Sequence, residues 1–292
     1  MSAALQVRPR GRQPDQMRDV TIVYEGLDRV DGSARFGFGS TKSLSSVSGP
    51  IEVRPTLENP AQATLDIQIR PLAAIAGTDS KALATILKSI FAPSLFLSHH
   101  PRTLVQIVGQ ALCGTDSGNG LGSAGRGWNA SLTASLVNAT TAAFVNAGSV
   151  PMKGVVCAVS VGRLQSEDAR ATTLILDPEE AELPRLAGSG CFAFLFSAVL
   201  PASPLASADV PPCSLLWTNY TTAAPFDVSE LSHARELAEK GARQVWQKMK
   251  ESVAWLENSS SSAPRVKAEV KAEDEEPAGG MDMDVDDEKV EI

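Results

Sequence analysis

A stretch of alternating side chains near the N-terminus constrains the fold of this chain more than any other feature. Residues 31–55 read DGSARFGFGSTKSLSSVSGPIEVRP, with small or apolar residues alternating with polar ones. A period of two is typical of strands that bury one face. Asp31-Gly32 favours a turn before the stretch, and Gly49-Pro50 favours a turn that closes it. The stretch therefore predicts two short antiparallel strands with a tight connection at Gly39-Ser40.

Further strands and three helices are expected along the chain. Alternating or continuous apolar runs predict strands at residues 19–27, 63–70, 103–112, 154–161, 172–177 and 191–198. Apolar residues at helical spacing predict helices at 80–91, 128–147 and 227–256. The helix at 128–147 carries no charge, so we expect it to be enclosed on most sides.

Local signals predict how two of these helices begin and end. We expect Asp79 or Ser80 to cap the first helix and Pro93 to stop it. Asp227 and Glu230 fit a capping box at the start of the third helix.

The charge of the chain is concentrated at its C-terminus. Residues 257–292 hold 12 acids and 4 bases, whereas residues 1–256 hold 22 of each. The neutral body gives no bulk electrostatic signal for nucleic acid, although Arg8, Arg10, Arg12 and Arg18 leave a local basic patch open. These shifts in composition predict a polar lead at 1–17, a folded domain at 18–257 and a disordered acidic tail at 258–292.

Several classes of protein are disfavoured by what the sequence lacks. The cysteines, Cys113, Cys157, Cys191 and Cys213, stand apart without a zinc-ligand spacing, so we expect reduced core cysteines and no metal or cofactor. No secretory signal or run of about 18 apolar residues is found, which favours an intracellular protein away from membranes. The three histidines fit no catalytic motif and are expected at the surface.

A glycine-rich segment at 113–127 leaves two interpretations open. Gly120–Gly125 formally matches GxGxxG between a strand and a helix, which would make it a phosphate cradle in a nucleotide-binding module. A flexible loop insertion is the simpler interpretation, because no acid for a ribose occurs from Ser117 through Ser166.

The tail contains two candidate modification sites. Val266–Glu269 and Val270–Glu273 are tandem hydrophobic-Lys-x-acid tetrads, which resemble acceptor sites for a ubiquitin-like modifier at Lys267 and Lys271. The alternative is a solubilising tail whose negative charge repels nucleic acid locally.

Several blocks of the sequence resemble the RNase PH family. DGSA, the Gly-Ser-Thr-Lys step and SGPIE follow that family's pattern, roughly DGS-A-x-F-x-x-G-x-T-x-V-x-x-x-x-GP-x-E, with Leu44 where Val is usual. Arg8–Arg12 stands where the family has R-x-DGR, with Arg10 in place of Asp. The blocks at 138–143, 146–164 and 174–182 extend the resemblance, most closely to members that form the eukaryotic RNA exosome ring.

The resemblance covers about residues 8–256 and implies the fold class. It is an α/β (α+β) RNase PH-like fold, with two related halves of mixed sheet packed with helices.

The resemblance also implies where the chemistry of active members would lie. There, a Gly-Gly-Thr-Arg step opening the buried helix holds phosphate, but this chain reads Ala130-Ser131-Leu132-Thr133. A second phosphate-binding Arg before the first helix has no counterpart in Ala73–Asp79. The two family Asp positions fall at Ala181 and Ala187.

Three hypotheses follow from this comparison of residues. The first is a non-catalytic ring subunit of the RNA exosome, in the nucleus, nucleolus and cytoplasm. Its implied partners are other RNase PH-like subunits in a hetero-hexameric ring, RNA-binding cap subunits, a hydrolytic nuclease and single-stranded RNA in the channel. The second is an active phosphorolytic exoribonuclease with a shifted acid site at Asp177, Glu179, Glu180 and Glu182, although these glutamates are also expected as a solvated run. The third is the nucleotide-binding module.

Overall fold

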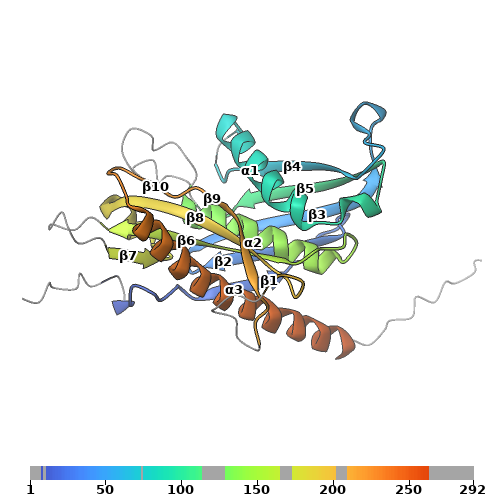
Figure 1. Cartoon of the computed structure of the whole chain (residues 1–292). Helices are drawn as coiled ribbons and strands as arrows, with labels where there is room; N and C mark the ends of the chain where they lie inside the picture. Colours follow the sequence, from blue (N-terminus) through green and yellow to red (C-terminus); the bar gives the residue numbers. More distant parts are fainter. Residues whose placement is uncertain are drawn as a thin grey trace, which may run out of the picture.

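The part of the chain that the structure describes forms two five-stranded sheets and three long helices (Figure 1). The structure, a computed structural model, describes residues 8, 11–73, 75–113, 129–164, 173–201 and 209–262. The glycine-rich segment from 114, the C-terminal residues from 263, and thus Lys267 and Lys271, lie outside the described residues.

The first sheet has the strand order β1-β2-β3-β5-β4. Its strands are β1 (Val20–Tyr24), β2 (Gly32–Phe38), β3 (Thr41–Glu52), β4 (Thr64–Arg70) and β5 (Thr103–Ala111). All neighbours are antiparallel except β4 and β5. A parallel pair needs a crossover, which α1 (Thr78–Ser94) provides.

The β2–β3 hairpin confirms the prediction for residues 31–55. The two strands pair antiparallel from Gly32↔Val47 to Phe38↔Thr41, and Gly39 turns with a φ of 55°. Phe36 and Phe38 point into the core, where the rings meet edge to face. The expected turn at Gly49-Pro50 is wrong, because β3 continues through an irregularity to Glu52.

The second sheet has the order β10-β8-β6-β7, and β9 also pairs with β8. Its strands are β6 (Val155–Leu164), β7 (Thr173–Leu176), β8 (Leu186–Phe196), β9 (Cys213–Thr218) and β10 (Thr221–Thr222). The described pairings in this sheet are all antiparallel, so only the first sheet is mixed. The sequence did not predict β9 and β10, because the side chains of β9 are half-buried without alternation.

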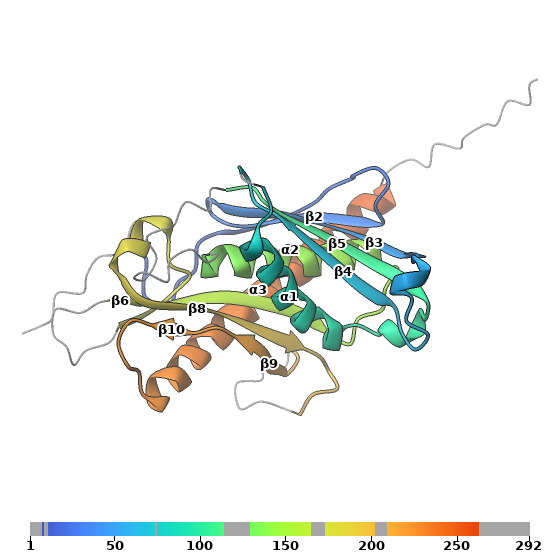
Figure 2. The ribbon, with the colours of Figure 1, turned by 90° about the horizontal axis from the view of Figure 1, so that it is seen from above.

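Helix α2 (Ala130–Ala147) lies between the two sheets (Figure 2). Its residues 130–144 are all buried, which confirms the expected enclosed helix. Hydroxyl pairs join it to β3 on one side, at Ser43–Ser135 and Ser45–Thr140. On the other side the Asn138 amide donates a hydrogen bond to the backbone C=O of Ala158 and accepts one from its N–H. Ala158 lies in the part of β6 that does not pair with β7.

The third helix, α3 (Val228–Ser262), packs against the second sheet and reaches β1. Its predicted apolar stripe is buried from Ala234 to Met249. Near its far end the hydroxyl groups of Ser252 and Tyr24 are 2.9 Å apart, which ties the helix to the first sheet. None of the described helices is both long and apolar enough to cross a bilayer.

Three predicted helix signals are wrong. Gly77 occupies the N-cap of α1 and no side chain caps it, while Pro93 lies inside the helix. At α3, Asp227 accepts hydrogen bonds from the backbone of Val228 and the hydroxyl of Ser229. The expected capping box fails because Glu230 instead accepts a hydrogen bond from the Tyr220 hydroxyl.

The four cysteines are free, as the sequence predicted. Cys157 and Cys191 are fully buried, and burial raises the pKa of both thiols. They pack as small apolar side chains in the described core.

We predict that Asn138→Ala lowers the free energy of unfolding by about 3 kcal/mol, because it leaves a buried N–H and a buried C=O of Ala158 without a partner. Chemical denaturation measures this loss. Asn146→Ala on the same helix is the matched control, because half-buried Asn146 donates one hydrogen bond, to Ser33. Equal losses for the two variants would contradict the role of Asn138.

Candidate functional site

The N-terminus of α2 is the position where the family resemblance implies a phosphate site. Asn129 caps the helix by accepting a hydrogen bond from the backbone N–H of Ser131 at 2.9 Å. Leu132 and Thr133 follow in the first turn and are 1% and 3% exposed. Neither leucine nor threonine carries a positive charge that could bind an anion. The Thr133 hydroxyl, moreover, already donates a hydrogen bond to the backbone carbonyl of Asn129.

The two alanines at the family's acid positions lie on different elements. Ala181 is exposed on the short 3-10 helix η5 (Glu180–Arg185), and half-buried Ala187 lies in β8. Methyl groups neither position a metal nor transfer a proton. The carboxylates that the resemblance implies for active members are therefore not present at these two positions.

Asp177 joins this region to the start of α2. Its buried carboxylate accepts a hydrogen bond from the Ser131 hydroxyl at 3.0 Å. Arg18 donates two hydrogen bonds to the same carboxylate, from Nε to Oδ2 at 2.8 Å and from Nη2 to Oδ1 at 2.6 Å. The backbone N–H of Arg18 adds a third contact to Oδ2 at 3.0 Å. With both oxygens held by a guanidinium, Asp177 is committed to an internal ion pair.

Glu182 forms a second buried ion pair. Arg8 donates from Nε at 2.8 Å to Oε1 and from Nη2 at 3.1 Å to Oε2. Arg12 and the backbone N–H of Glu179 also donate to Oε2. The prediction of a solvated glutamate run is therefore wrong for Glu182, whose side chain is 6% exposed, and holds for exposed Glu180.

These contacts form one arginine–carboxylate cluster, which consists of Arg8, Arg12, Arg18, Asp177, Glu179 and Glu182. Three positive and three negative charges balance within it. The described N-terminal arginines therefore pair inside the protein and do not form the local basic patch that the sequence left open. Arg10 lies outside the described residues.

The cluster changes the ionisation of two of its members. Burial acts to raise the pKa of Glu182, but the hydrogen bonds from Arg8 and Glu179 and the charges of Arg8 and Arg12 outweigh burial and leave that pKa lowered. Burial, and then the charge of Arg8, lower the pKa of Arg12. In both residues the pKa responds to removal of the charged group from water and to the charges of its neighbours.

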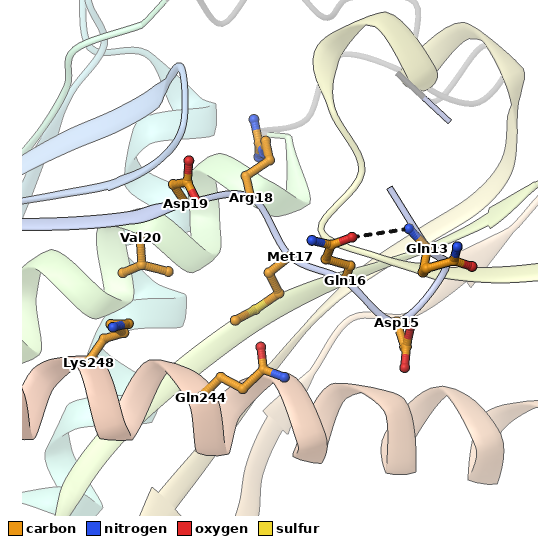
Figure 3. A pocket seen from close by; sticks show the side chains of 9 residues that line it. All are labelled: Gln13, Asp15, Gln16, Met17, Arg18, Asp19, Val20, Gln244 and Lys248. Atoms are coloured by element: carbon orange, nitrogen blue, oxygen red, sulfur yellow. Dashed lines mark hydrogen bonds between the residues drawn. The ribbon is translucent and has the colours of Figure 1, made fainter. Parts of the chain in front are cut away.

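A polar pocket of about 480 Å³ lies beside the cluster, between the N-terminal segment and α3 (Figure 3). Residues 13 and 15–20 line one wall, and Gln244 and Lys248 line the other. Arg18 points away from α3 in this view, toward Asp177, and Lys248 pairs with Glu251. Both cations at the pocket are thus already paired.

Other candidate groups do not gather into a catalytic site. Within the described residues no group of three or more His, Cys, Asp or Glu side chains could hold a metal ion. His99 is exposed and stacks on Phe96, and His233 is exposed on α3. The sequence-based reasoning missed the role of Arg18 and Glu182, since their partners lie 159 and 174 residues away along the chain.

We predict that the cluster makes the protein lose stability in acid. The pKa of Glu182 is lower in the folded chain than its usual value of 4.5. Its stabilisation is therefore complete above that value and is lost as the pH falls through the folded pKa. Denaturation between pH 3 and pH 7, a range of about four units, measures this acid limb.

Glu182→Gln should flatten the acid limb and cost about 3 kcal/mol at neutral pH, because it leaves buried Arg8 without a charged partner. Glu180→Gln is the matched control, because Glu180 is exposed. It should leave the acid limb and the free energy of unfolding at neutral pH unchanged. An acid limb of the same slope in Glu182→Gln would show that another group controls it.

Comparison with known proteins identifies the family of this chain. The 3′ exoribonuclease family, domain 1 (RNase PH), matches residues 16–149. The Exosome complex exonuclease RRP46 homolog of Oryza sativa subsp. japonica is 30% identical over 179 residues, which are 61% of this chain and 67% of that protein. The Exosome complex component RRP46 of Saccharomyces cerevisiae is 41% identical over 86 residues, 30% of this chain and 39% of that protein.

A solved structure supports the same assignment. The crystal structure of rice Rrp46 covers 85% of this chain and 100% of its own, with a TM-score of 0.65 and 25% identity. The match confirms the RNase PH-like fold implied by the sequence resemblance. The chain belongs to the RNase PH family of 3′ exoribonuclease-type proteins.

Proposed function

We propose that this chain is a non-catalytic structural subunit of an RNA exosome core ring, which supports 3′-to-5′ RNA processing and degradation by other subunits. One observation carries the proposal: Asp177 and Glu182, the buried acids nearest the lost catalytic positions, are both held in ion pairs with arginines. Leu132 and Thr133 occupy the phosphate position without a cation. The proteins most similar to this chain include exosome components of the RRP46 type.

The proposed partners follow from this role. They are other RNase PH-like subunits in a hetero-hexameric ring, RNA-binding cap subunits and a hydrolytic nuclease. Single-stranded RNA would pass through the ring channel, held by contacts that are mainly electrostatic and tolerant of sequence. The proposed sites of action are the nucleus, the nucleolus and the cytoplasm, as in ribosomal RNA maturation and RNA turnover.

An active phosphorolytic exoribonuclease is the competing function. It needs Asp177 or a neighbouring glutamate as a free acid, but in the cluster only Glu179 keeps a partly exposed side chain, at 21%. Glu180 is exposed, and it forms no ion pair with a lysine or arginine of the described residues. The nucleotide-binding alternative depends on Gly120–Gly125, outside the described residues; unchanged nucleotide titration after deletion of 118–125 would exclude it.

We predict that the purified chain, alone and with its ring partner, releases no nucleoside diphosphates from single-stranded RNA in the presence of inorganic phosphate. Thin-layer chromatography of labelled RNA measures the product. The non-catalytic role would be refuted if the wild-type chain released nucleoside diphosphates with phosphate but not without it, and if Glu180→Gln lowered that release. Isolation of the tagged chain from cells should recover RNase PH-like subunits in comparable amounts.

We further propose that Lys267 and Lys271 accept a small ubiquitin-like modifier. In a conjugation reaction the wild-type chain should form slower-migrating products that are lost in Lys267→Arg, Lys271→Arg. Lys289→Arg is the matched control, because Lys289 lies in the same acidic tail without the tetrad. An unmodified wild-type chain, or conjugation that survives the double substitution, would contradict the assignment.

A further inference from the structure

An exposed stack of two rings lies where α1 ends. Phe96 is 37% exposed, whereas most of the phenylalanines in the described residues are fully buried. Its ring stacks on exposed His99, with centroids 5.1 Å apart and an interplanar angle of 17°. The Lys153 ammonium lies 5.6 Å from the centroid of the Phe96 ring. The two rings and a cation thus share one patch of surface.

Two segments far apart in the sequence hold this stack in place. The backbone N–H of Phe96 donates to Pro151, and that of Lys153 donates to Ser94. Leu95 and Met152 form a β-bridge between these two bonds. The backbone segments that carry the ring and the cation are therefore held next to each other, so binding a ligand requires no rearrangement of these two segments.

Arg102 follows His99 by three residues along the chain and supplies a second exposed cation to this segment. Its backbone has a φ of 60°, a left-handed conformation that is uncommon for a residue other than glycine. The backbone N–H of Arg102 donates to Asn59, so the turn is tied to the loop before β4. The side chain is 70% exposed and makes one ion pair, with Glu58 at 3.3 Å. A pair this exposed contributes little and leaves the guanidinium free to exchange partners.

The chemistry of this patch fits single-stranded nucleic acid. Flat rings stack against bases, and neighbouring cations contact phosphates, without regard to sequence. Within segments 93–102 and 150–153, Phe96 is the one large apolar side chain with substantial exposure. A protein partner would favour a broader apolar patch, and the mixture of rings and cations favours an RNA strand.

We propose that Phe96 and His99 form a stacking platform for a base of single-stranded RNA, with Lys153 and Arg102 contacting the adjoining phosphates. The choice of RNA as ligand rests on the proposed function. The platform itself requires only the described geometry. It assigns a specific contact surface to the RNA that the proposed ring would conduct.

Phe226 provides a matched control for the platform. Its ring is 42% exposed and packs edge to face on Tyr220, and none of the described lysines or arginines lies over it. It precedes α3, whereas the platform lies at the end of α1. Removal of Phe226 therefore tests whether loss of any exposed aromatic ring changes RNA binding.

Fluorescence anisotropy of the full-length chain with a labelled single-stranded oligo(U) RNA tests the proposal. Phe96→Ala should weaken binding by about fivefold or more. Lys153→Ala should weaken binding and reduce the salt dependence by about one phosphate contact. Phe226→Ala should bind like the wild type. Phe96→Leu, which keeps apolar bulk without a flat ring, should be as weak as Phe96→Ala, while Phe96→Tyr should restore binding.

Several results would overturn the platform. These are wild-type affinity in Phe96→Ala, full binding in Phe96→Leu, or no oligo(U) binding by the wild-type chain. A Phe96→Ala chain that binds RNA normally but recovers fewer ring or cap subunits from cells would assign the patch to a protein partner. Nucleoside diphosphate release by the wild type would refute the non-catalytic function but would not change the difference in RNA affinity between the wild type and Phe96→Ala. Failure of the platform and failure of the proposed function can therefore be told apart.

Discussion

One buried ion pair, between Arg18 and Asp177, connects the main parts of the fold. Arg18 precedes the first strand, and Asp177 follows β7 in the second sheet. The same guanidinium donates to Thr41 in β3 and to Ser131 in α2. One side chain therefore links the N-terminal segment, both sheets and the central helix. Removing either charge would leave the other buried without compensation, which costs far more than an exposed pair.

The same pair supports the proposal that this chain keeps the family fold without the family's catalytic activity. Catalytic carboxylates need freedom to bind a metal or exchange a proton, and Asp177 and Glu182 have neither. Their oxygens accept hydrogen bonds from arginines that the N-terminal segment brings in. Leu132 fills the helix start with a buried apolar side chain. The region is thus built as a structural joint between the two sheets.

Local patterns in the sequence predicted the framework well, and long-range pairing escaped them. The hairpin of β2 and β3 follows from the alternation of side chains and from a glycine turn. Both signals lie within residues 31–55, so they can be recognised without knowledge of the fold. The enclosure of α2 follows from its lack of charge. By contrast, Glu182 looks solvated among other glutamates, and only the fold brings Arg8 to it. Glu230 likewise leaves its expected cap because Tyr220 and Arg163 lie within reach.

Binding of inorganic phosphate to the purified chain tests the central claim most directly, because it does not depend on a partner or on RNA. Isothermal titration calorimetry should show no saturable binding, since the start of α2 offers Leu132 and Thr133 in place of a cation and the nearby arginines are paired with carboxylates. The account would be contradicted by saturable phosphate binding that is lost in Ser131→Asp. This substitution would place a negative charge at the start of α2.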